Sequence, residues 1–516
     1  MTSVLLLLNR THWQYSACRT LAFSGRIFYQ QVEICAETLL QLLLSDKGQF
    51  NTAKTAALAG FFSIVIQQSD ALILITDRVR SFPLFYRKSD NQLQVSDDCM
   101  SLSNNMSLDE IACREFTSLG YVTGNDTLYQ ATKQVPAATV IRFDATTTVE
   151  QRYFIFKRTA AQSTQSESQL MQTLHSLMAS LVDECVKLAA GRQIVVPLSG
   201  GYDSRAILLF LQKTGYKNIH TFTFGAATSP EIAVAGQLAR ELKVSWTPVF
   251  YTEKMWRELR HDAEFDRYLH FITNGVSVPN IQVWPAIRIL LQQGVIEPNA
   301  LLLPGHTGDF VSGGHLSGET TAVTEMMLPE ISLAIYKKYY QLDKLPVSQP
   351  LLERIQSNCK GLLEDKPDWT VEGLKDAWNW QERQSKFIVN SNRYYDFFQL
   401  EWWMPFWQVE FVDFWLQVPT PMLRQQMLWR RFVEFECQQS SVSKVTGNAA
   451  YIIKVPQFLY RGLNYFFDRS LLLWFVPFGY WLRYRLGVSK HSGTLNSYLT
   501  RLILRKLVNR TKNSEN

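Results

Sequence analysis

Two serines, two glycines and an aspartate lie close together in the segment IVVPLSGGYDSRAILLFLQ, which begins at Ile194. The β-branched run at its start is typical of a buried parallel strand, and the apolar run from Ala206 is typical of a helix. Glycine lets a ligand approach the backbone closely, and a helix N-terminus attracts anions. The pattern predicts a pyrophosphate-binding loop rather than an ordinary strand–turn–helix corner. Its residues are Ser199, Gly200, Gly201, Asp203 and Ser204.

A second glycine-rich loop follows another apolar run, in ALLLPGHTGDFVSGG from Ala300. In an open parallel sheet, ligands bind at the carboxyl ends of the strands, where the strand order reverses. If the two strands are neighbours, both loops overhang one crevice. Asp203 and Asp309 then suit a magnesium ion that also holds phosphate oxygens. The alternative for Asp309 alone is a carboxylate that caps its own loop.

The chain divides into three regions. Residues 1–156 carry the β-type runs FFSIVIQ, ALILITD, NQLQVSD and ATVIRFD, separated by polar turns. Ser, Thr and Gln then accumulate up to residue 169, which predicts a linker. Over residues 170–440 the pattern predicts a doubly wound α/β domain that becomes mostly helical beyond about residue 325. Its first predicted elements are a helix at 170–190, a strand at 194–198, a helix at 205–213, a strand at 219–225 and a helix at 230–243. Residues 441–516 form an aromatic and basic helical extension.

Composition limits the class of protein. The 516 residues suffice for two or three domains, and a hydrophobic fraction of 46% with 19% charged residues indicates a globular chain. The seven cysteines are scattered without a CxxC pair, which indicates reduced thiols and a cytoplasmic protein. Neither they nor the eight histidines show metal-ligand spacing, so no intrinsic metal site is expected.

The two ends of the chain raise the question of membrane contact. The start, MTSVLLLLNRTHW, lacks a basic segment before its apolar run, so it predicts a first strand rather than a signal peptide. No apolar run reaches the eighteen or so residues that a spanning helix needs. The tail mixes Trp, Tyr and Phe with Lys and Arg, which suits either a membrane interface at the inner face or a helical pair packed on the core. Cations that alternate with large apolar residues argue against nucleic acid.

Ser-Gly-Gly-x-Asp-Ser resembles the signature of the PP-loop ATP pyrophosphatases, which split ATP into AMP and pyrophosphate. Three further segments resemble the asparagine synthetase family. DRVRSFPLFYRKSDNQLQVSDD is similar to the DRxGxKPLYY segment of its amidotransferase domain. LLPGHTGDFVSGG is similar to LSGxGxDExxGG, and EWWMPFWQVEFVDFWLQVP to ExRxPFLDxxLVEFxxxLP. These motifs occur in the family's order over residues 60–430.

The resemblance implies a PP-loop, doubly wound parallel-sheet synthetase domain. It also implies an N-terminal degenerate Ntn-type (class II amidotransferase-like) α+β domain and a helical C-terminal region. It implies ATP and Mg²⁺ as cofactors and a carboxylate that attacks the α-phosphorus of ATP, after which ammonia or an amine opens the acyl-adenylate. By the same resemblance, the backbone of Leu198, Phe224 and Gly305 frames the adenosine, while Asp203 and Asp309 hold the metal.

The N-terminal domain departs from the family pattern at its nucleophile. The family's glutaminase needs a Cys exposed by loss of the first Met, whereas this chain begins Met1, Thr2, Ser3, Val4. Thr2 could act as an N-terminal nucleophile after processing. However, the RGPD and NGEIYN segments that hold glutamine are also absent, so glutaminase activity is not expected. The domain resembles the scaffold of β-lactam synthetase relatives, which have lost the same cysteine.

The synthetase half departs as well. The family's acidic residue before the metal aspartate is His306, and the Glu after that aspartate is Phe310. A family lysine that stabilises the transition state falls near Gln426, so Arg430 is the expected replacement cation, with Arg424 and Arg431 as alternatives. An arginine there acts only as a fixed charge. His306 is the expected base for the incoming nitrogen, the alternative being a histidine bonded to its own loop.

These losses argue against aspartate as the substrate. The pattern is similar to asparagine synthetase-like proteins of bacterial surface-polysaccharide pathways, proposed to convert a uronic acid carboxylate into an amide. Arg383, Lys386, Arg393, Tyr394 and Tyr395 suit a carboxylated sugar, or else a buried packing segment. The expected partners are a small-molecule carboxylate and ammonia or an amine. A homodimer stays open, as does a catalytically degenerate subunit that binds nucleotide within a biosynthetic complex.

Overall fold

A computed structural model gives the structure of the chain. It describes residues 3–8, 12–45, 48–89, 92–103, 106–158, 163–259, 261–316, 321–342, 346–364, 368–443, 499–500 and 502–508. Most of the predicted C-terminal extension, and the predicted nucleophile position Thr2, lie outside these residues. Within them, no helix combines the length and apolar character needed to cross a membrane.

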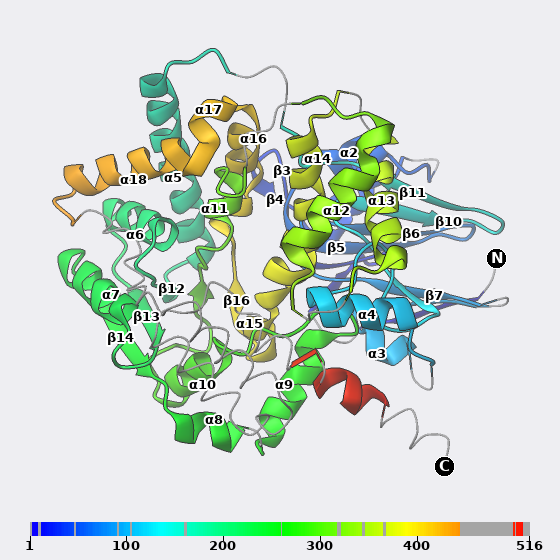
Figure 1. Cartoon of the computed structure of the whole chain (residues 1–516), viewed down its shortest axis with the longest axis horizontal. Coiled ribbons are helices and arrows are strands. Elements are labelled where there is room, and N and C mark those ends of the chain that lie inside the picture. The colour runs from blue at the N-terminus through cyan, green and yellow to red at the C-terminus, as the bar shows by residue number, and fades with distance from the viewer. Residues whose placement is uncertain are drawn as a thin grey trace.

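Two sheets form the N-terminal half (Figure 1). The larger has the order β11-β10-β6-β5-β3-β2, with β4 paired to β3, and all its pairings are antiparallel. The smaller has the order β1-β8-β7-β9, in which only β1 and β8 run parallel. The bounds of these strands are Ser3–Leu7 (β1), Trp13–Tyr15 (β2), Leu21–Tyr29 (β3), Val32–Glu33 (β4), Leu58–Gln67 (β5), Leu72–Thr76 (β6), Phe85–Lys88 (β7), Gln92–Ser96 (β8), Thr132–Gln134 (β9), Thr139–Phe143 (β10) and Thr148–Arg152 (β11).

The larger sheet is covered on both faces, which explains its nearly continuous apolar strands. In β6, Ile73 and Ile75 join the cluster that packs on helix α1 (Ala36–Leu43), while Leu72 and Leu74 join the cluster shared with the smaller sheet. All four are fully buried. The strand runs predicted for this half are confirmed as β5, β6, β8 and β10.

The second half contains a five-stranded parallel sheet of order β14-β13-β12-β15-β16. The strand that comes first in the chain, β12, lies between β13 and β15, so the strand order reverses at β12. The two glycine-rich loops follow these neighbouring strands, as the sequence predicted. The strands are Ile194–Pro197 (β12), Ile219–Gly225 (β13), Ser245–Phe250 (β14), Leu301–Leu302 (β15) and Glu401–Trp402 (β16).

Helices surround this sheet and make up most of the described residues beyond 325 (Figure 1). The three predicted helices around the first loop are confirmed, although α6 begins three residues earlier than expected. The helices used below are Cys99–Leu102 (α3), Glu110–Leu119 (α4), Glu167–Ala189 (α5), Tyr202–Thr214 (α6), Pro230–Glu241 (α7), Ala263–Thr273 (α9), Gly308–Val311 (α11), Leu328–Tyr339 (α12), Val371–Trp378 (α14), Arg393–Phe397 (α15) and Met427–Gln439 (α18).

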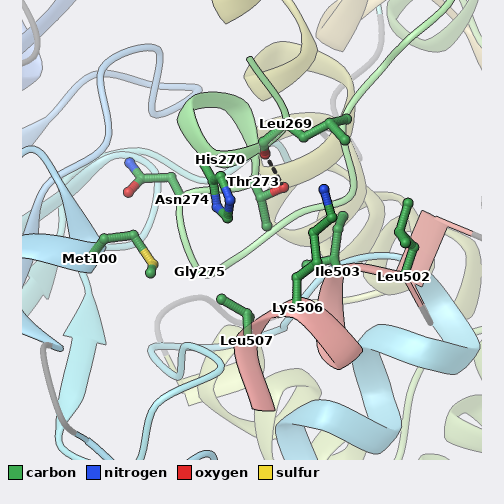
Figure 2. A pocket seen from close by; sticks show the side chains of 10 residues that line it. All are labelled: Met100, Leu269, His270, Thr273, Asn274, Gly275, Leu502, Ile503, Lys506 and Leu507. Carbon is green, nitrogen blue, oxygen red and sulfur yellow. Dashed lines mark hydrogen bonds between the residues drawn. The ribbon is translucent and has the colours of Figure 1, made fainter. Parts of the chain in front are cut away.

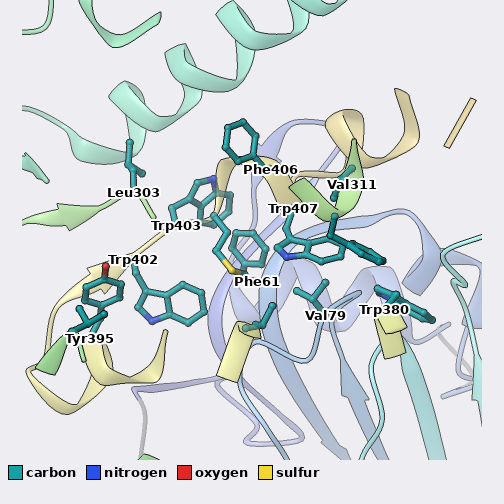
Figure 3. Close-up of a cluster of buried hydrophobic side chains, with 14 of the residues drawn as sticks. Phe61, Val79, Leu303, Val311, Trp380, Tyr395, Trp402, Trp403, Phe406 and Trp407 are labelled. Atoms are coloured by element: carbon teal, nitrogen blue, oxygen red, sulfur yellow. The ribbon is translucent and has the colours of Figure 1, made fainter. Parts of the chain in front are cut away.

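An aromatic cluster joins the two halves (Figure 3). Trp403 lies edge-on to Phe61 of β5, with ring centroids 4.5 Å apart, and Trp402 stacks on the same phenyl ring at 6.2 Å. Beside them, Glu401 accepts from Arg26 Nε of β3 at 2.7 Å and from an Arg192 guanidinium nitrogen at 2.6 Å. Trp403 stands where the family motif carries arginine, so an apolar contact between the domains replaces a charge there.

A wide helical segment at Asn379–Val389, with π-helical geometry, makes a second link between the halves. Lys386 Nζ lies 2.6 Å from Glu382 Oε2, and both side chains are fully buried. The same carboxylate accepts the Gly124 N–H at 3.0 Å, while Lys386 donates to the Gly124 carbonyl. Both backbone groups of one N-terminal residue are therefore bound by a buried ion pair of the other half.

The described part of the C-terminal region packs on the core. Residues 502–508 are helical and lie against α9, where Lys506 Nζ is 2.5 Å from Asp266 Oδ1. A small pocket between this helix, α3 and the end of α9 includes Met100, His270 and Asn274 (Figure 2). The aromatic tail before residue 499 lies outside the described residues.

Candidate active site

The first loop is held together by its own hydroxyls. Ser199 N–H donates to Ser204 Oγ at 3.2 Å, and Gly201 N–H donates to Ser199 Oγ at 3.3 Å. Gly201 is extended, with φ −79°, so it is not required for a left-handed turn. At Gly200 a Cβ would lie 3.0 Å from Val234 Cγ1 of α7, which leaves little space for a side chain. The loop therefore turns directly into the N-terminus of α6 with its backbone close to the helix beside it.

Asp203 lies in the first turn of α6 rather than in the loop as predicted. Its Oδ2 accepts the Asp309 N–H at 3.2 Å, and its Oδ1 accepts Trp429 Nε1–H at 2.7 Å. Burial, and secondarily the Asp309 charge, raise its pKa to about 7. The carboxylate is thus held by donors from two other elements but has no cation of its own among these contacts. Such a group gains from a bound cation.

Two glycines let the second loop close onto the first. A Cβ at Gly308 would lie 2.6 Å from Asp203 Cγ, and a Cβ at Gly305 would lie 2.9 Å from the Ser204 nitrogen. Thr307, between them, has φ 78° and accepts Trp407 Nε1–H at 3.1 Å. The left-handed backbone of Thr307, together with the lack of a side chain at Gly305 and Gly308, allows Asp309 to lie against Asp203.

Asp309 is largely open to solvent, with 57% of its side chain exposed. His315 Nε2 lies 3.6 Å from its Oδ2, and Lys338 Nζ donates to the His315 carbonyl at 3.4 Å. Burial lowers the pKa of both His315 and Lys338, and the Arg383 charge lowers them further. Two basic side chains, Lys338 and Arg383, therefore lie near His315, whose lowered pKa favours the neutral ring beside Asp309.

Helix α18 closes the other side of the first loop. Arg430 lies with its Cζ 5.7 Å from the centre of the Tyr202 ring, and Tyr202 OH donates to Glu434 at 2.9 Å. Arg430 is exposed. The predicted cation is thus next to the loop, where it contacts an aromatic face. Arg431 instead pairs with Glu167 on the surface.

Gln426, which lies near the family's lysine position, is a neutral side chain. Its Nε2 donates to Ser312 Oγ at 3.0 Å, beside the loop that carries Asp309. Both Gln425 and Gln426 have left-handed backbone, with φ 51° and 60°. The residue near the family's lysine position is therefore fixed by a neutral hydrogen bond. Any cation for a leaving group has to come from other elements, namely α12, α18 or the wide helix.

His306 lies four residues after the end of β15, next to Gly305. Its Nε2 is buried and has no hydrogen-bond partner, while Asn392 lies beside its ring. Burial lowers the pKa of His306, which favours the neutral imidazole. A neutral ring with a free nitrogen has the state that a general base needs.

The three positions expected to frame adenosine lie at or just after the carboxyl ends of β12, β13 and β15. Leu198 N–H already donates to Phe222 at 2.8 Å, and its carbonyl accepts Thr223 Oγ1–H at 2.7 Å. Leu198 thus has no N–H to offer a ligand. Phe224 is half-buried and stacks on Tyr251, with ring centroids 5.4 Å apart. The adenosine roles of Leu198, Phe224 and Gly305 remain predictions.

The segment expected to meet the substrate is mostly interior. Lys386 serves the domain interface, and Arg393, Tyr394 and Tyr395 are at most 1% exposed. For these residues the packing alternative is correct, because their side chains are enclosed by the wide helix, α9 and α15. Arg383 differs, since its charge acts on His315 at the crevice.

Sequence reasoning missed several residues that shape the site. Trp429 and Gly308 fix Asp203, and His315 and Lys338 add charge beside Asp309. Gly308 carried a signal, because a glycine directly before a candidate metal aspartate indicates close backbone approach. No sequence signal indicated Lys338, because a single lysine on a helix is ordinarily a solvated residue.

Comparisons with known proteins agree with this division of the chain. The asparagine synthase family matches residues 177–431, and the glutamine amidotransferase domain family matches residues 4–154. No curated protein sequence matches the chain.

Two solved structures are also similar. One is titled "Structure of the allosteric regulatory enzyme of purine biosynthesis" (11% identity, 64% of this chain and 60% of that one, TM-score 0.18). The other is glutamine phosphoribosylpyrophosphate amidotransferase from B. subtilis complexed with ADP and GMP (11% identity, 62% and 59%, TM-score 0.18). The chain thus spans about 60% of the length of these structures, and similarity at this level carries no argument about activity.

Proposed function

Because the chain belongs to the asparagine synthetase-like family, we propose that it is an ATP-dependent ligase that joins a carboxylate to ammonia or an amine. The reaction releases AMP and pyrophosphate. The observation that carries this proposal is the junction of the two loops, where Asp309 N–H donates to Asp203 and glycines remove the side chains that would separate them. An amide dipole, a helix N-terminus and two carboxylates at one sheet edge suit a metal-bound pyrophosphate.

The residues present fit a magnesium ion. Asp203 is a carboxylate whose raised pKa a cation would lower, and Asp309 is largely exposed beside it. Among the described residues, no group of three or more His, Cys, Asp or Glu side chains is placed to hold a metal. Phosphate oxygens would therefore complete the coordination, as magnesium commonly requires. Bound there, the ion would offset the negative charge that grows on the leaving pyrophosphate.

The chain's own cations supply the rest of that charge. These cations are Lys338 and Arg383, which lie near His315, itself 3.6 Å from Asp309, and Arg430, which lies over Tyr202. These residues stand in for the lysine that Gln426 replaces. Fixed positive charge at the point where negative charge develops lowers the barrier without reorganisation.

The proposed ligase reaction has two steps. A substrate carboxylate oxygen attacks the α-phosphorus of ATP, and the bond to the β-phosphate oxygen breaks, which gives an acyl-adenylate and pyrophosphate. The nitrogen nucleophile then attacks the acyl carbon and AMP leaves, while His306 Nε2 accepts the proton that the nitrogen loses. The free, buried Nε2 supports this second role.

The substrate is a carboxylate other than aspartate. Phe310, at the family's glutamate position, is 1% exposed and packs on Phe156 at 4.9 Å, so it offers no polar contact to an amino acid. We propose a uronic acid of a surface polysaccharide, on the resemblance described for the sequence. The reaction takes place in the cytoplasm, where ATP is available. Ammonia or an amine is supplied from outside the N-terminal domain, because the residues expected to hold glutamine are missing from the sequence.

A second candidate is a nucleotide-binding subunit without activity. It is favoured by the neutral Gln426 and by the absence of a direct cation contact to Asp203. The two candidates differ in a single experiment. Purified protein is incubated with ATP, magnesium and a panel of uronic and amino acids, and release of AMP and pyrophosphate is followed. Acid-dependent release that rises with a uronic acid supports the ligase. Nucleotide binding without release from any acid overturns it in favour of the subunit.

A further inference from the structure

The segment that connects the two domains contacts the short helix that carries Asp309. The amidotransferase family match ends at residue 154 and the asparagine synthase match begins at residue 177, so the connecting segment lies outside both. In this segment Phe156 is fully buried, and 11% of the Arg158 side chain is exposed. Side chains enclosed to this degree indicate a fixed contact rather than a solvated linker.

Phe156 packs against the residue that follows Asp309. Its ring centroid lies 4.9 Å from that of Phe310, and the Trp407 ring lies 6.4 Å from Phe156 and 6.1 Å from Phe310. Trp407 also donates from Nε1 to Thr307, which precedes the short helix. The three rings form one packed group, which fixes the backbone beside the aspartate through the Phe310 side chain.

Arg158 binds the other end of the same helix, α11. A helix of one turn leaves its last carbonyl groups without partners inside the helix. Arg158 donates from one terminal nitrogen to the Val311 carbonyl at 3.2 Å, and from the other to the Trp415 carbonyl at 3.1 Å. Its Nε donates to Asp376 Oδ2 of α14 at 3.2 Å. One guanidinium group thus ties the end of α11 to α14 and to α16 (Val409–Gln417).

The start of α11 is held by the second half of the chain. Asp203 accepts the Asp309 N–H at 3.2 Å, and Gly308 removes the side chain that would separate the two aspartates. A single turn contains few hydrogen bonds of its own, so its position depends on such outside contacts. Asp309 is therefore carried by a turn that the second half holds at its start and the connecting segment holds at its end.

We propose that Arg158, supported by Phe156, is a positioning residue for the Asp309 carboxylate. The inference rests on the proposed function, in which Asp203 and Asp309 hold magnesium. Arg158 keeps the end of α11 in place, and α11 in turn keeps Asp309 beside Asp203. Groups that orient a metal ligand typically change the metal affinity by about 10–100-fold when they are lost. The metal site of the synthetase half thus depends on a side chain outside the region that matches its family.

Arg158→Lys tests this role while it preserves the charge. Lysine keeps a cation beside the buried Asp376, but its single nitrogen cannot reach the three acceptors that three guanidinium nitrogens reach. Arg78→Lys is the matched control, because Arg78 also links the first half to α16. It pairs with Asp413 at 2.9 Å, and its Cζ lies 4.1 Å from the centre of the Phe154 ring. These contacts do not involve α11.

Manganese binding to the full chain is measured by electron paramagnetic resonance, with ATP and without a carboxylate substrate. The manganese concentration at half-saturation should rise at least about tenfold in Arg158→Lys and stay within about twofold in Arg78→Lys. Phe156→Leu, which removes the ring contact with Phe310, should shift it in the same direction and serves if Arg158→Lys does not fold. Unchanged binding in the folded variants, or an equal loss in Arg78→Lys, overturns the inference. A wild-type chain that binds no manganese overturns the proposed metal site as well, so the two failures are distinguishable.

Hydrogen exchange followed by mass spectrometry, without ATP or metal, reports on the helix itself. The N–H groups of Ser312, Gly313 and Gly314 bond to carbonyls of α11. Their exchange should be faster in Arg158→Lys than in the wild type or in Arg78→Lys. Unchanged exchange overturns the contact's role in holding α11. Faster exchange with unchanged manganese binding means that Arg158 stabilises the turn alone, which overturns its role in positioning the carboxylate.

Discussion

The buried carboxylate at the domain interface and the carboxylates at the edge of the parallel sheet differ in whether their charge is compensated. At the domain interface, Glu382 is fully buried, yet it is paired with Lys386 and accepts the Gly124 N–H, while Lys386 donates to the Gly124 carbonyl. At the sheet edge, Asp203 has only N–H donors, and its nearest charged neighbour is another aspartate. The first arrangement satisfies every group it buries. The second leaves negative charge uncompensated at the point where the proposed magnesium ion and pyrophosphate would sit, which is the pattern expected of a functional site.

The largest effect is expected for Asp203→Asn. Pyrophosphate release should fall by at least about a hundredfold, because the variant loses the charge that holds the metal while it keeps an oxygen for Trp429. Release is measured with the acid identified in the screen, and far-ultraviolet circular dichroism checks the fold. Asp109→Asn is the control, since Asp109 caps α4 through Ala112 N–H and asparagine caps equally well. Full turnover in folded Asp203→Asn would remove the metal role.

The stability of Asp203→Asn as a function of pH tests whether the charge at the sheet edge is uncompensated. The pKa of Asp203 is raised from 3.8 to about 7, so the folded state keeps a proton that the unfolded state loses, and stability falls as pH rises between these values. Asparagine carries no such penalty. The Tm of Asp203→Asn should therefore exceed that of the wild type by an amount that grows from about pH 4 and levels off above about pH 7. An equal difference at all pH values would contradict the charged state assigned to this crevice.

At the interface, Lys386→Met should destabilise the fold by about 3–5 kcal/mol, because it leaves the Glu382 charge buried and unpaired. The double variant Lys386→Met with Glu382→Gln should be less destabilised than the single one. Both are measured by urea unfolding. Lys254→Met provides the control, since Lys254 and Glu258 are 81% and 65% exposed and such pairs contribute less than about 1 kcal/mol. A double variant that is worse than the single would show that the pair acts through packing alone.

His306→Ala separates the two steps of the proposed reaction. Pyrophosphate release should persist, whereas amide formation should fall by about a hundredfold, the usual lower value for a lost general base. The two products are quantified in the same reaction mixture. Equal loss of both would mean that His306 only shapes the loop beside Gly305.

The smallest effect is expected for Glu401→Gln. Its contacts with Arg26 and Arg192 are short, but each of the three side chains is between 23% and 31% exposed, so the pairs should contribute about 1 kcal/mol or less. Activity should be unchanged, because Glu401 lies at the domain contact. Urea unfolding and pyrophosphate release check both expectations. A large loss of activity would place Glu401 in the site despite its two structural arginines.

Motifs whose residues are close together in the chain could be predicted from the sequence. The glycine loop, the strand before it and the helix after it are neighbours along the chain, so Ser199 to Ser204 could be placed without a structure. Trp429 could not, because it reaches Asp203 from a helix 226 residues further along the chain, and Lys338 could not, because its contact with the His315 carbonyl depends on how α12 packs. The substrate segment misled for a related reason. Arg393 and Tyr395 have the composition of a ligand site, but tertiary packing turns them inward.

The contact of Trp402 and Trp403 with Phe61 determines which changes in the N-terminal half the fold can tolerate. Strand β16, which carries Trp402, is only two residues long and forms the outer edge of the parallel sheet. Deleting the N-terminal half would bare indole rings along that edge and leave the Lys386–Glu382 pair without Gly124. Substitutions that erase an N-terminal nucleophile carry no such penalty. The contact with the second domain therefore constrains the first domain independently of any chemistry at its N-terminus.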